Sequence, residues 1–162
     1  MKRSRRLVRM VTLDLARFRL GALCGLACLF PVFGPLSGCG GPERPWRPLP
    51  EVTDCDAARA VCETVGSGVH VRLRLGPGVR AMHPFPVVLE VPKAHGVVIR
   101  FEMPGMDMGK NVYRLDRAAP GRWAGKAILP ICLSGRTDWV ARVEIERADG
   151  RYLAVFPFHV GP

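Results

Sequence analysis

The feature that most constrains the fold of this chain is a repeated alternation of apolar and polar residues. Residues 69–75 read VHVRLRL, so that every second side chain is apolar. A period of two is that of a β-strand with one buried face. Similar short segments follow, separated by turn signals that contain Gly and Pro, over residues 85–91, 97–103, 106–115, 122–133, 139–145 and 152–158.

Seven short strands with turns at intervals of about 8–12 residues are typical of an immunoglobulin-like sandwich. We therefore expect an all-β fold, an immunoglobulin-like antiparallel β-sandwich, over residues 67–162, with a small barrel as the alternative. Proline cannot donate to a strand ladder. Pro84, Pro86 and Pro92 should therefore confine the strand 85–91 to an edge of its sheet, or lie at its ends.

The first 38 residues have the organisation of an export signal. A basic stretch, 1–19, precedes an uncharged run, 20–36, and then Leu36-Ser37-Gly38-Cys39, which resembles a bacterial lipobox. We expect cleavage before Cys39 and attachment of lipid, including palmitate, to its thiol. A transmembrane anchor is the weaker alternative, because a spanning helix needs about 20 apolar residues and this run is shorter and contains prolines.

The residue after the cysteine is Gly40, which by resemblance implies the outer membrane of a Gram-negative bacterium, with the domain facing the periplasm. Residues 40–53 contain four prolines and two glycines and should form a semi-extended tether. The segment 39–66 would thus hold the lipidated end, the tether and a short cysteine-containing stretch. Its residues 54–64 could form one short helix capped by Asp54.

Three further cysteines, Cys55, Cys62 and Cys132, are disulfide candidates in an oxidising compartment. On a continuous helix the Cα atoms of Cys55 and Cys62 would be roughly 10.5 Å apart, at about 1.5 Å per residue. A disulfide needs about 4.4–6.8 Å. Either the segment is not helical and these two cysteines bridge, or one of them bridges Cys132. We expect a bridge that involves Cys62.

The positive charge argues little for a nucleic-acid partner. The formal net charge is +10, but residues 1–38 carry +6 of it, in a segment that we expect to be removed. Enzyme signatures are also missing: neither Ser67 nor Ser134 has a nucleophile-elbow context, and no HExxH, CxxC or phosphate loop occurs. We expect a non-catalytic protein that binds the membrane through its lipid and binds no nucleic acid.

The most unusual segment is Met103-Pro104-Gly105-Met106-Asp107-Met108-Gly109, with three methionines in six residues. Thioethers are soft, neutral ligands that suit Cu(I). We expect Met103, Met106 and Met108 to converge on such an ion, with Met82 and His83 as additional candidates. The alternative is packing, because methionine fills irregular gaps in cores. Cys132 is then either a disulfide partner or a free soft ligand.

A wider pattern resembles the YtkA-like and FixH-like bacterial envelope domains, over roughly residues 68–160. The resemblance rests on residues 97–109, Tyr113-Arg114-Leu115, Pro120-Gly121-Arg122-Trp123, Leu129-Pro130-Ile131-Cys132, Gly135-Arg136 and Trp139. It implies a small immunoglobulin-like module linked to copper supply, or to the assembly of respiratory oxidases through a protein partner. Carried over by position, Met103, Met106 and Met108 would be the residues nearest the metal.

Two functions thus remain open. The first is a lipid-anchored module that handles Cu(I) for respiratory oxidase assembly or copper homeostasis. The second is a non-catalytic structural or interaction lipoprotein of the cell envelope, in which the methionines only pack the core.

Overall fold

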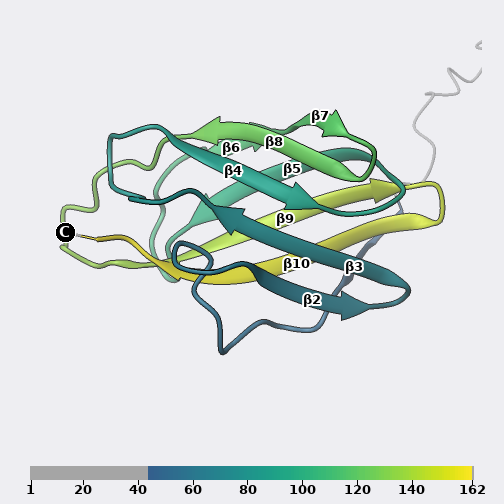
Figure 1. Cartoon of the computed structure of the whole chain (residues 1–162). Coiled ribbons are helices and arrows are strands. Elements are labelled where there is room, and N and C mark those ends of the chain that lie inside the picture. Colours follow the sequence, from purple (N-terminus) through teal and green to yellow (C-terminus); the bar gives the residue numbers. More distant parts are fainter. Residues whose placement is uncertain (1–43, 162) are drawn as a thin grey trace, which may run out of the picture. The chain divides into compact units, whose positions relative to one another are not determined.

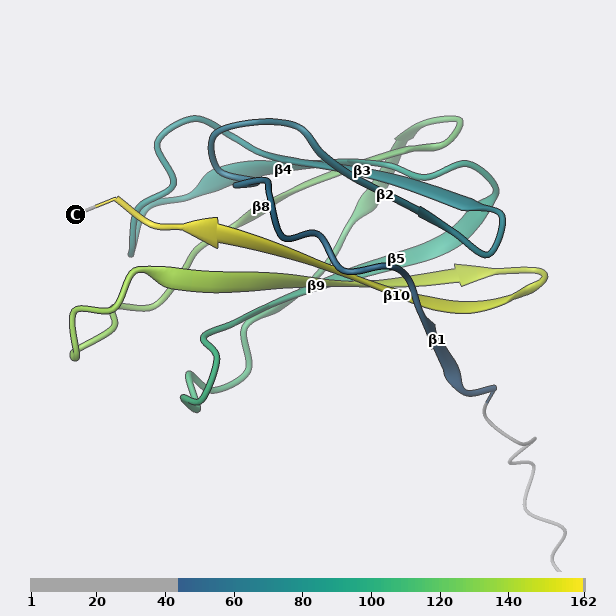
Figure 2. The same ribbon diagram turned by 90° about the horizontal axis from the view of Figure 1, so that it is seen from below.

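A computed structural model describes residues 44–161, and these residues form two five-stranded sheets that lie face to face (Figures 1 and 2). The predicted export signal and Cys39 lie outside the described residues. In spatial order, the first sheet contains β1 (Trp46–Pro48), β10 (Gly150–His159), β9 (Asp138–Arg147), β5 (Ala94–Glu102) and β6 (Val112–Arg114). The second contains β2 (Cys62–Gly66), β3 (Val69–Leu75), β4 (Phe85–Glu90), β8 (Arg122–Ala127) and β7 (Asp116–Ala119).

Neighbouring strands are antiparallel throughout, except for β1, which pairs in parallel with β10. The core lies between the sheets, because every second residue of each long strand points inward and is buried. Aromatic rings fill its middle: Phe101 meets both Phe85 and Phe158 edge to face, with ring centroids 5.7 and 5.8 Å apart. The all-β prediction is confirmed.

The structure has ten strands where the alternation predicts seven. The strands β1 and β2 are additional. The predicted strands 106–115 and 122–133 are wrong in their extent, and the second of them ends as β8 at Ala127. Gly109 has a φ of +71°, and its N–H binds the carboxylate of Asp107 at 2.8 Å, which forms a tight turn rather than a strand. The chain then crosses from the first sheet to the second at the buried Leu115, so that two short strands, β6 and β7, replace one long strand.

The strand predicted at 85–91 is present as β4, but its prolines do not place it at an edge, since β4 lies between β3 and β8. Pro86 fits because β3 has already ended beside it. Gly76 follows the end of β3 and donates its N–H to the Pro86 carbonyl at 2.7 Å. A Cβ on Gly76 would lie 2.2 Å from the proline ring, so only glycine permits this close approach.

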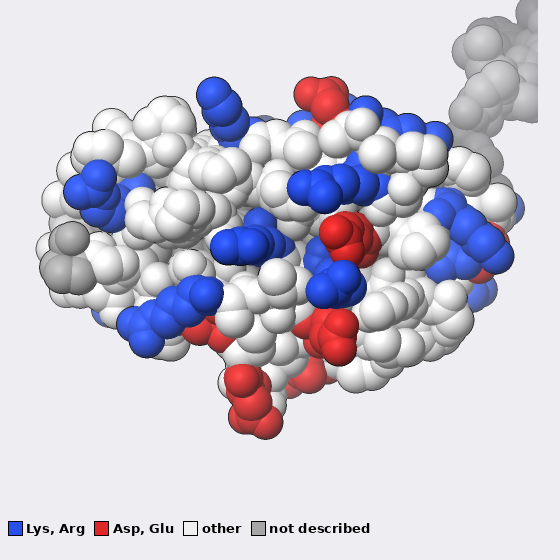
Figure 3. Space-filling view, viewed as in Figure 1, with Lys and Arg blue, Asp and Glu red and all other residues white. Residues whose placement is uncertain are grey.

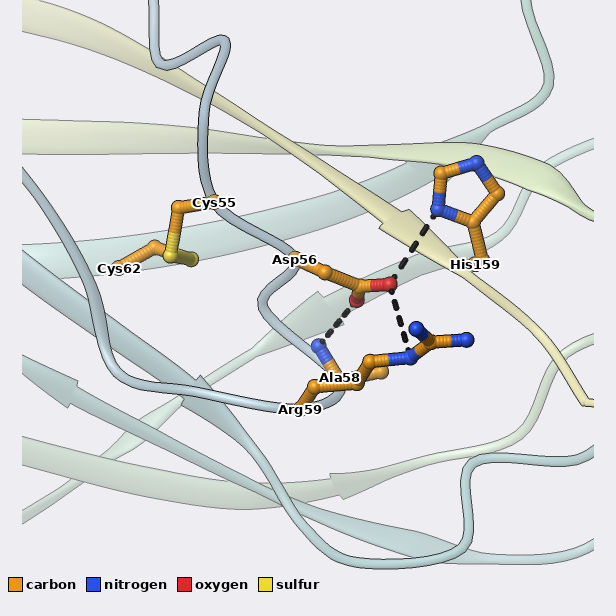
Figure 4. Close-up of a disulfide and its surroundings, with 6 residues drawn as sticks. All are labelled: Cys55, Asp56, Ala58, Arg59, Cys62 and His159. Carbon is orange, nitrogen blue, oxygen red and sulfur yellow. Dashed lines mark hydrogen bonds and ion pairs between the residues drawn. A yellow bond between two sulfur atoms is a disulfide. The ribbon is translucent and has the colours of Figure 1, made fainter.

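The short helix predicted over 54–64 is also wrong, and residues 44–161 contain no α-helix at all. Tertiary hydrogen bonds replace the helical bonds, because Ala57 donates to Pro157 at 3.1 Å and accepts from the N–H of Leu75 at 3.0 Å. A turn forms instead, in which the carboxylate of Asp56 accepts the N–H of Ala58 and binds His159 across the molecule (Figure 4).

This non-helical path resolves the choice between disulfide partners. Cys55 and Cys62 are bonded to each other, with their Cα atoms 5.7 Å apart (Figure 4). A bridge that involves Cys62 is thus confirmed, and Cys132 is left as a free thiol. Consistent with the absence of α-helix, nothing within residues 44–161 offers a helix with the length and hydrophobicity needed to span a bilayer.

Candidate functional site

The methionine segment begins with a β-turn at the end of β5. The N–H of Met106 donates to the carbonyl of Met103 at 3.0 Å, and Gly105 has a φ of +76°. Proline at the second position of a turn and glycine at the third are typical of a type II turn, which needs positive φ at the third position. The turn places Met103 and Met106 opposite each other as a bridged pair.

A second loop, residues 128–137, connects β8 to β9 and so crosses from the second sheet to the first. It leaves β8 at Ile128, whose backbone N–H and carbonyl both bind the hydroxyl of Tyr113, at 3.1 and 2.7 Å. The N–H of Gly135 closes a turn on the carbonyl of Cys132 at 3.1 Å. Both loops emerge at the same end of the molecule, where the chain also ends (Figure 2).

The sulfur atoms meet where these two loops touch. The Sγ of Cys132 lies 3.4 Å from the Sδ of Met103. The hydroxyl of Ser134 lies 3.0 Å from the same Sγ and donates to the Sδ of Met106 at 3.6 Å. We call Met103, Met106, Cys132 and Ser134 the sulfur cluster. One side of the cluster is buried, where Met103 is 1% exposed, and the other side faces solvent, where Met106 is 36% exposed. Cys132 is half-buried between them.

One arginine fixes the two loops to each other. The Nη1 of Arg136 donates to the carbonyl of Pro104, in the methionine turn, at 2.8 Å. The same guanidinium is held by both carboxylate oxygens of Asp138, through its Nε at 2.9 Å and through its Nη2. This pairing raises the pKa of Arg136 and lowers the pKa of Asp138, so that both groups carry their charges at neutral pH.

The thiol of Cys132 is activated by its surroundings. The hydrogen bond with the side chain of Ser134 is the largest effect and lowers the pKa of this thiol. Burial opposes it as the second-largest effect, and backbone hydrogen bonds and the positive charge of Arg136 lower the pKa further. The thiolate is the form that binds metals and reacts with electrophiles. This free cysteine is therefore both accessible and shifted toward its reactive form.

The other candidates from the sequence lie farther from this contact. Met108 is half-buried and packs against the core, and together with Met103 and Met106 it lines a groove over β5 and β9. Met82 is exposed, and its N–H binds the carbonyl of Leu129 at 2.8 Å, which brings its loop beside the loop of Cys132. The Nδ1 of His83 is engaged by the carbonyl of Ala81 at 2.9 Å.

The convergence of the three methionine sulfurs on one ion stays a prediction, since the turn pairs the backbones of Met103 and Met106. Met103 contacts Cys132, which the sequence offers as a free soft ligand, and Met106 contacts Ser134, which was not predicted. These pairs are separated by 29 and 28 residues in the chain. The only hint in the sequence was that Cys132 has the parity opposite to the core residues of its segment. Parity can show that a side chain avoids the core, but it cannot show which distant loop it meets.

The donor atoms of the sulfur cluster favour one class of ion. Two thioethers and a thiol are soft ligands of the type that selects Cu(I), whereas carboxylates and carbonyls suit Mg²⁺ or Ca²⁺. The carboxylate of Asp107, next to Met106 in the chain, already accepts the N–H of Gly109. Among the described residues, no three side chains of the His, Cys, Asp and Glu types gather where a metal could be held. The residues present thus fit a soft monovalent cation.

Comparison with known proteins adds no family assignment. None of the family models that were compared with the chain matches it. No curated protein matches its sequence either. The similarity to YtkA-like and FixH-like domains therefore stays a prediction that rests on the motifs described above.

Proposed function

We propose that this chain is a lipid-anchored protein of the bacterial cell envelope whose immunoglobulin-like domain carries Cu(I) and passes it to a protein partner. The observation that carries the proposal is the contact between the methionine turn and the loop of Cys132, with sulfur atoms 3.4 Å apart. Soft sulfur donors that meet at a solvent-accessible edge suit uptake and release of a soft monovalent ion.

The surroundings of the sulfur cluster support transfer to another protein. Two large apolar side chains flank Cys132 and point into solvent: Ile131 is 58% exposed and Leu133 is 98% exposed. Exposed apolar side chains that gather beside a polar site are typical of protein contact surfaces. A partner that docked on them would be adjacent to the bound ion, as transfer to an oxidase assembly factor or to a copper-homeostasis protein requires.

Titration with Cu(I) tests the metal half of the proposal. The full chain is titrated against a chromophoric Cu(I) chelator, with ascorbate to keep copper reduced. A Met106→Leu/Met108→Leu double variant keeps the apolar volume but removes two thioethers. We expect its Cu(I) affinity to fall at least about tenfold. About tenfold is the lower limit of the loss in affinity expected when groups around a metal are altered. Identical curves for the two proteins would refute metal binding by this segment.

Substitution of Cys39 tests the anchor. Cells that express the full chain are labelled with a radioactive fatty acid, and the wild-type protein should incorporate label and stay with the membrane fraction. A Cys39→Ser variant has no thiol to acylate, so it should incorporate none. Equal labelling of a Cys132→Ser variant serves as the control. Label retained by Cys39→Ser would refute lipidation at this residue.

A second candidate function, that of a non-catalytic structural or interaction lipoprotein, has one observation in its favour. Met103 is almost completely buried and extends the inward-facing row of β5 beyond Phe101. A methionine in that position packs the core whether or not it also binds metal. In this second account the Cu(I) titration above would show no specific binding, and the exposed Ile131 and Leu133 would serve only to recruit a partner.

A further inference from the structure

We propose that the thiolate of Cys132 is the third ligand of the Cu(I) site, together with Met103 and Met106. The inference rests on the proposed function and specifies which atoms bind the ion. Cys132 takes the place of Met108, which the sequence pattern predicts as the third ligand. The bound species would be a soft monovalent cation, Cu(I) or its analogue Ag(I), in a three-sulfur environment.

The first support is the direction in which Met103 aims its sulfur. The side chain is 1% exposed and belongs to the core cluster, where any apolar neighbour would satisfy it. Its sulfur, the one atom of the side chain that can bind a metal, nevertheless lies 3.4 Å from the sulfur of the free thiol. With the zinc–thiolate distance of about 2.3 Å as a guide, two sulfurs on one trigonal ion lie about 4 Å apart. The sulfur atoms of Met103 and Cys132 therefore need to move only slightly farther apart to bind the same ion.

The second support is the position of Ser134 between the sulfur atoms of Cys132 and Met106. Its hydroxyl is within hydrogen-bonding distance of the Cys132 Sγ and of the Met106 Sδ, at 3.0 and 3.6 Å. Both sulfurs are therefore neighbours of the same hydroxyl oxygen. Because Met106 is exposed, rotation of its side chain can bring the thioether toward the thiolate without disturbing the core.

The third support is the rigid connection between the two loops that carry the ligands. Arg136 holds the carbonyl of Pro104, one residue after Met103, and Asp138 holds Arg136. Ligands that are fixed in advance lose less conformational entropy when an ion binds. The guanidinium also places a positive charge near the thiolate. Among the described residues, Arg136, Asp138 and, farther out, His159 are the charged or titratable groups that influence this site.

The coordination step is balanced without a redox partner. The S–H bond of Cys132 breaks, its proton passes to solvent, and a sulfur–copper bond forms while copper remains Cu(I). The cation and the thiolate together make a neutral unit. A neutral unit costs less to place against the apolar core than a cation bound only by neutral thioethers. Met108, which packs against the core at the side, is not needed in this set.

The test compares single variants of the full chain in the same Cu(I) competition titration. Ascorbate keeps copper reduced while leaving the disulfide between Cys55 and Cys62 intact. Changes around metal ligands cost about 10–100-fold in affinity, so loss of a ligand itself should cost at least about 100-fold in Cys132→Ser. Met108→Leu is the matched control and should bind as the wild type does. The cysteines outside the described residues are common to all the variants, so the difference isolates Cys132.

A second readout needs no variant and therefore does not depend on how Cys132→Ser folds. The wild-type chain is treated with an alkylating reagent with and without one equivalent of Cu(I), and Cys132 is followed by peptide mass spectrometry. Bound copper should protect this thiol. Unchanged alkylation of Cys132, or equal affinity of Cys132→Ser and wild type, would overturn the assignment while leaving the proposed function intact. Absence of Cu(I) binding by the wild type would overturn both.

Discussion

At the scale of single residues, the proposed site would give Met103 two roles that are usually separate. Its side chain fills a position in the core beyond Phe101, and its sulfur meets the free thiol of Cys132. Core packing depends on the volume of the side chain, whereas metal binding depends on one atom of it. Substitutions that change only one of these properties can separate the two roles.

Two substitutions of Met103 should therefore behave differently. Met103→Ala creates a cavity, and its free energy of unfolding should fall by about 2–5 kcal/mol. Met103→Leu keeps the volume, so it should cost less than about 1.5 kcal/mol. Urea denaturation followed by tryptophan fluorescence measures both. A Leu variant that is nearly as stable as wild type but weaker in Cu(I) affinity is the expected result, and a Leu variant with unchanged affinity would leave Met103 with a packing role only.

The sequence predicted part of this site for a clear reason. Proline and glycine after Met103 encode a turn, so that Met103 and Met106 meet through local geometry alone. Cys132 and Ser134 come from a loop almost thirty residues away, and their position depends on how β8, β9 and β5 are arranged in two sheets. Alternation identifies strands, but it does not determine which strands become neighbours.

At the scale of elements, the alternation missed the strands β1 and β2, because they contain residue types that are not typical of strands. The inward-facing positions of β2 include Cys62 and the buried Thr64, whose hydroxyl binds the carbonyl of Pro50 at 2.8 Å. The strand β1 consists of Trp46, Arg47 and Pro48, in a proline-rich stretch that predicts a free tether. Proline is tolerated there because β1 is an edge strand.

The pairing of β1 with β10 predicts a cost for disturbing the tether. The N–H of Leu49 donates to the carbonyl of Leu153 at 2.8 Å, and its side chain is 6% exposed. We expect Leu49→Ala to lower the free energy of unfolding by about 2–5 kcal/mol, as truncation of a buried leucine does. Glu51→Ala, at an exposed position close by, should change it by less than about 0.5 kcal/mol. Equal stabilities in urea denaturation would mean that this stretch is a free linker.

At the scale of the whole molecule, this pairing changes how far the domain can stand from a membrane. If lipid is attached at Cys39, only residues 40–45 separate it from β1, rather than the whole stretch 40–53. Six residues reach at most about 20 Å when fully extended, so the proposed anchor would keep the domain close to the bilayer. The loops that carry the sulfur cluster lie at the end of the sheets where the chain terminates, whereas β1 lies toward the opposite end, beside the first residues of β10 (Figure 2).

The outer surface of the second sheet differs in character from the sulfur cluster, because charged side chains line it. Basic and acidic side chains are interspersed over the face in Figure 3. Arg72, on this sheet, pairs with both Glu63 and Glu90, at 3.7 and 2.9 Å. Exposed ion pairs of this kind contribute little to stability, at most about 1 kcal/mol each.

X-ray absorption at the copper edge tests the central claim most directly. The full chain is loaded with one equivalent of Cu(I), and the scattering around the metal identifies its nearest neighbours. We predict a first shell made only of sulfur, with about three atoms at about 2.3 Å, and a loss of sulfur scattering in Cys132→Ser. A shell dominated by nitrogen or oxygen, or a spectrum that Cys132→Ser leaves unchanged, would contradict a copper site built from Met103, Met106 and Cys132.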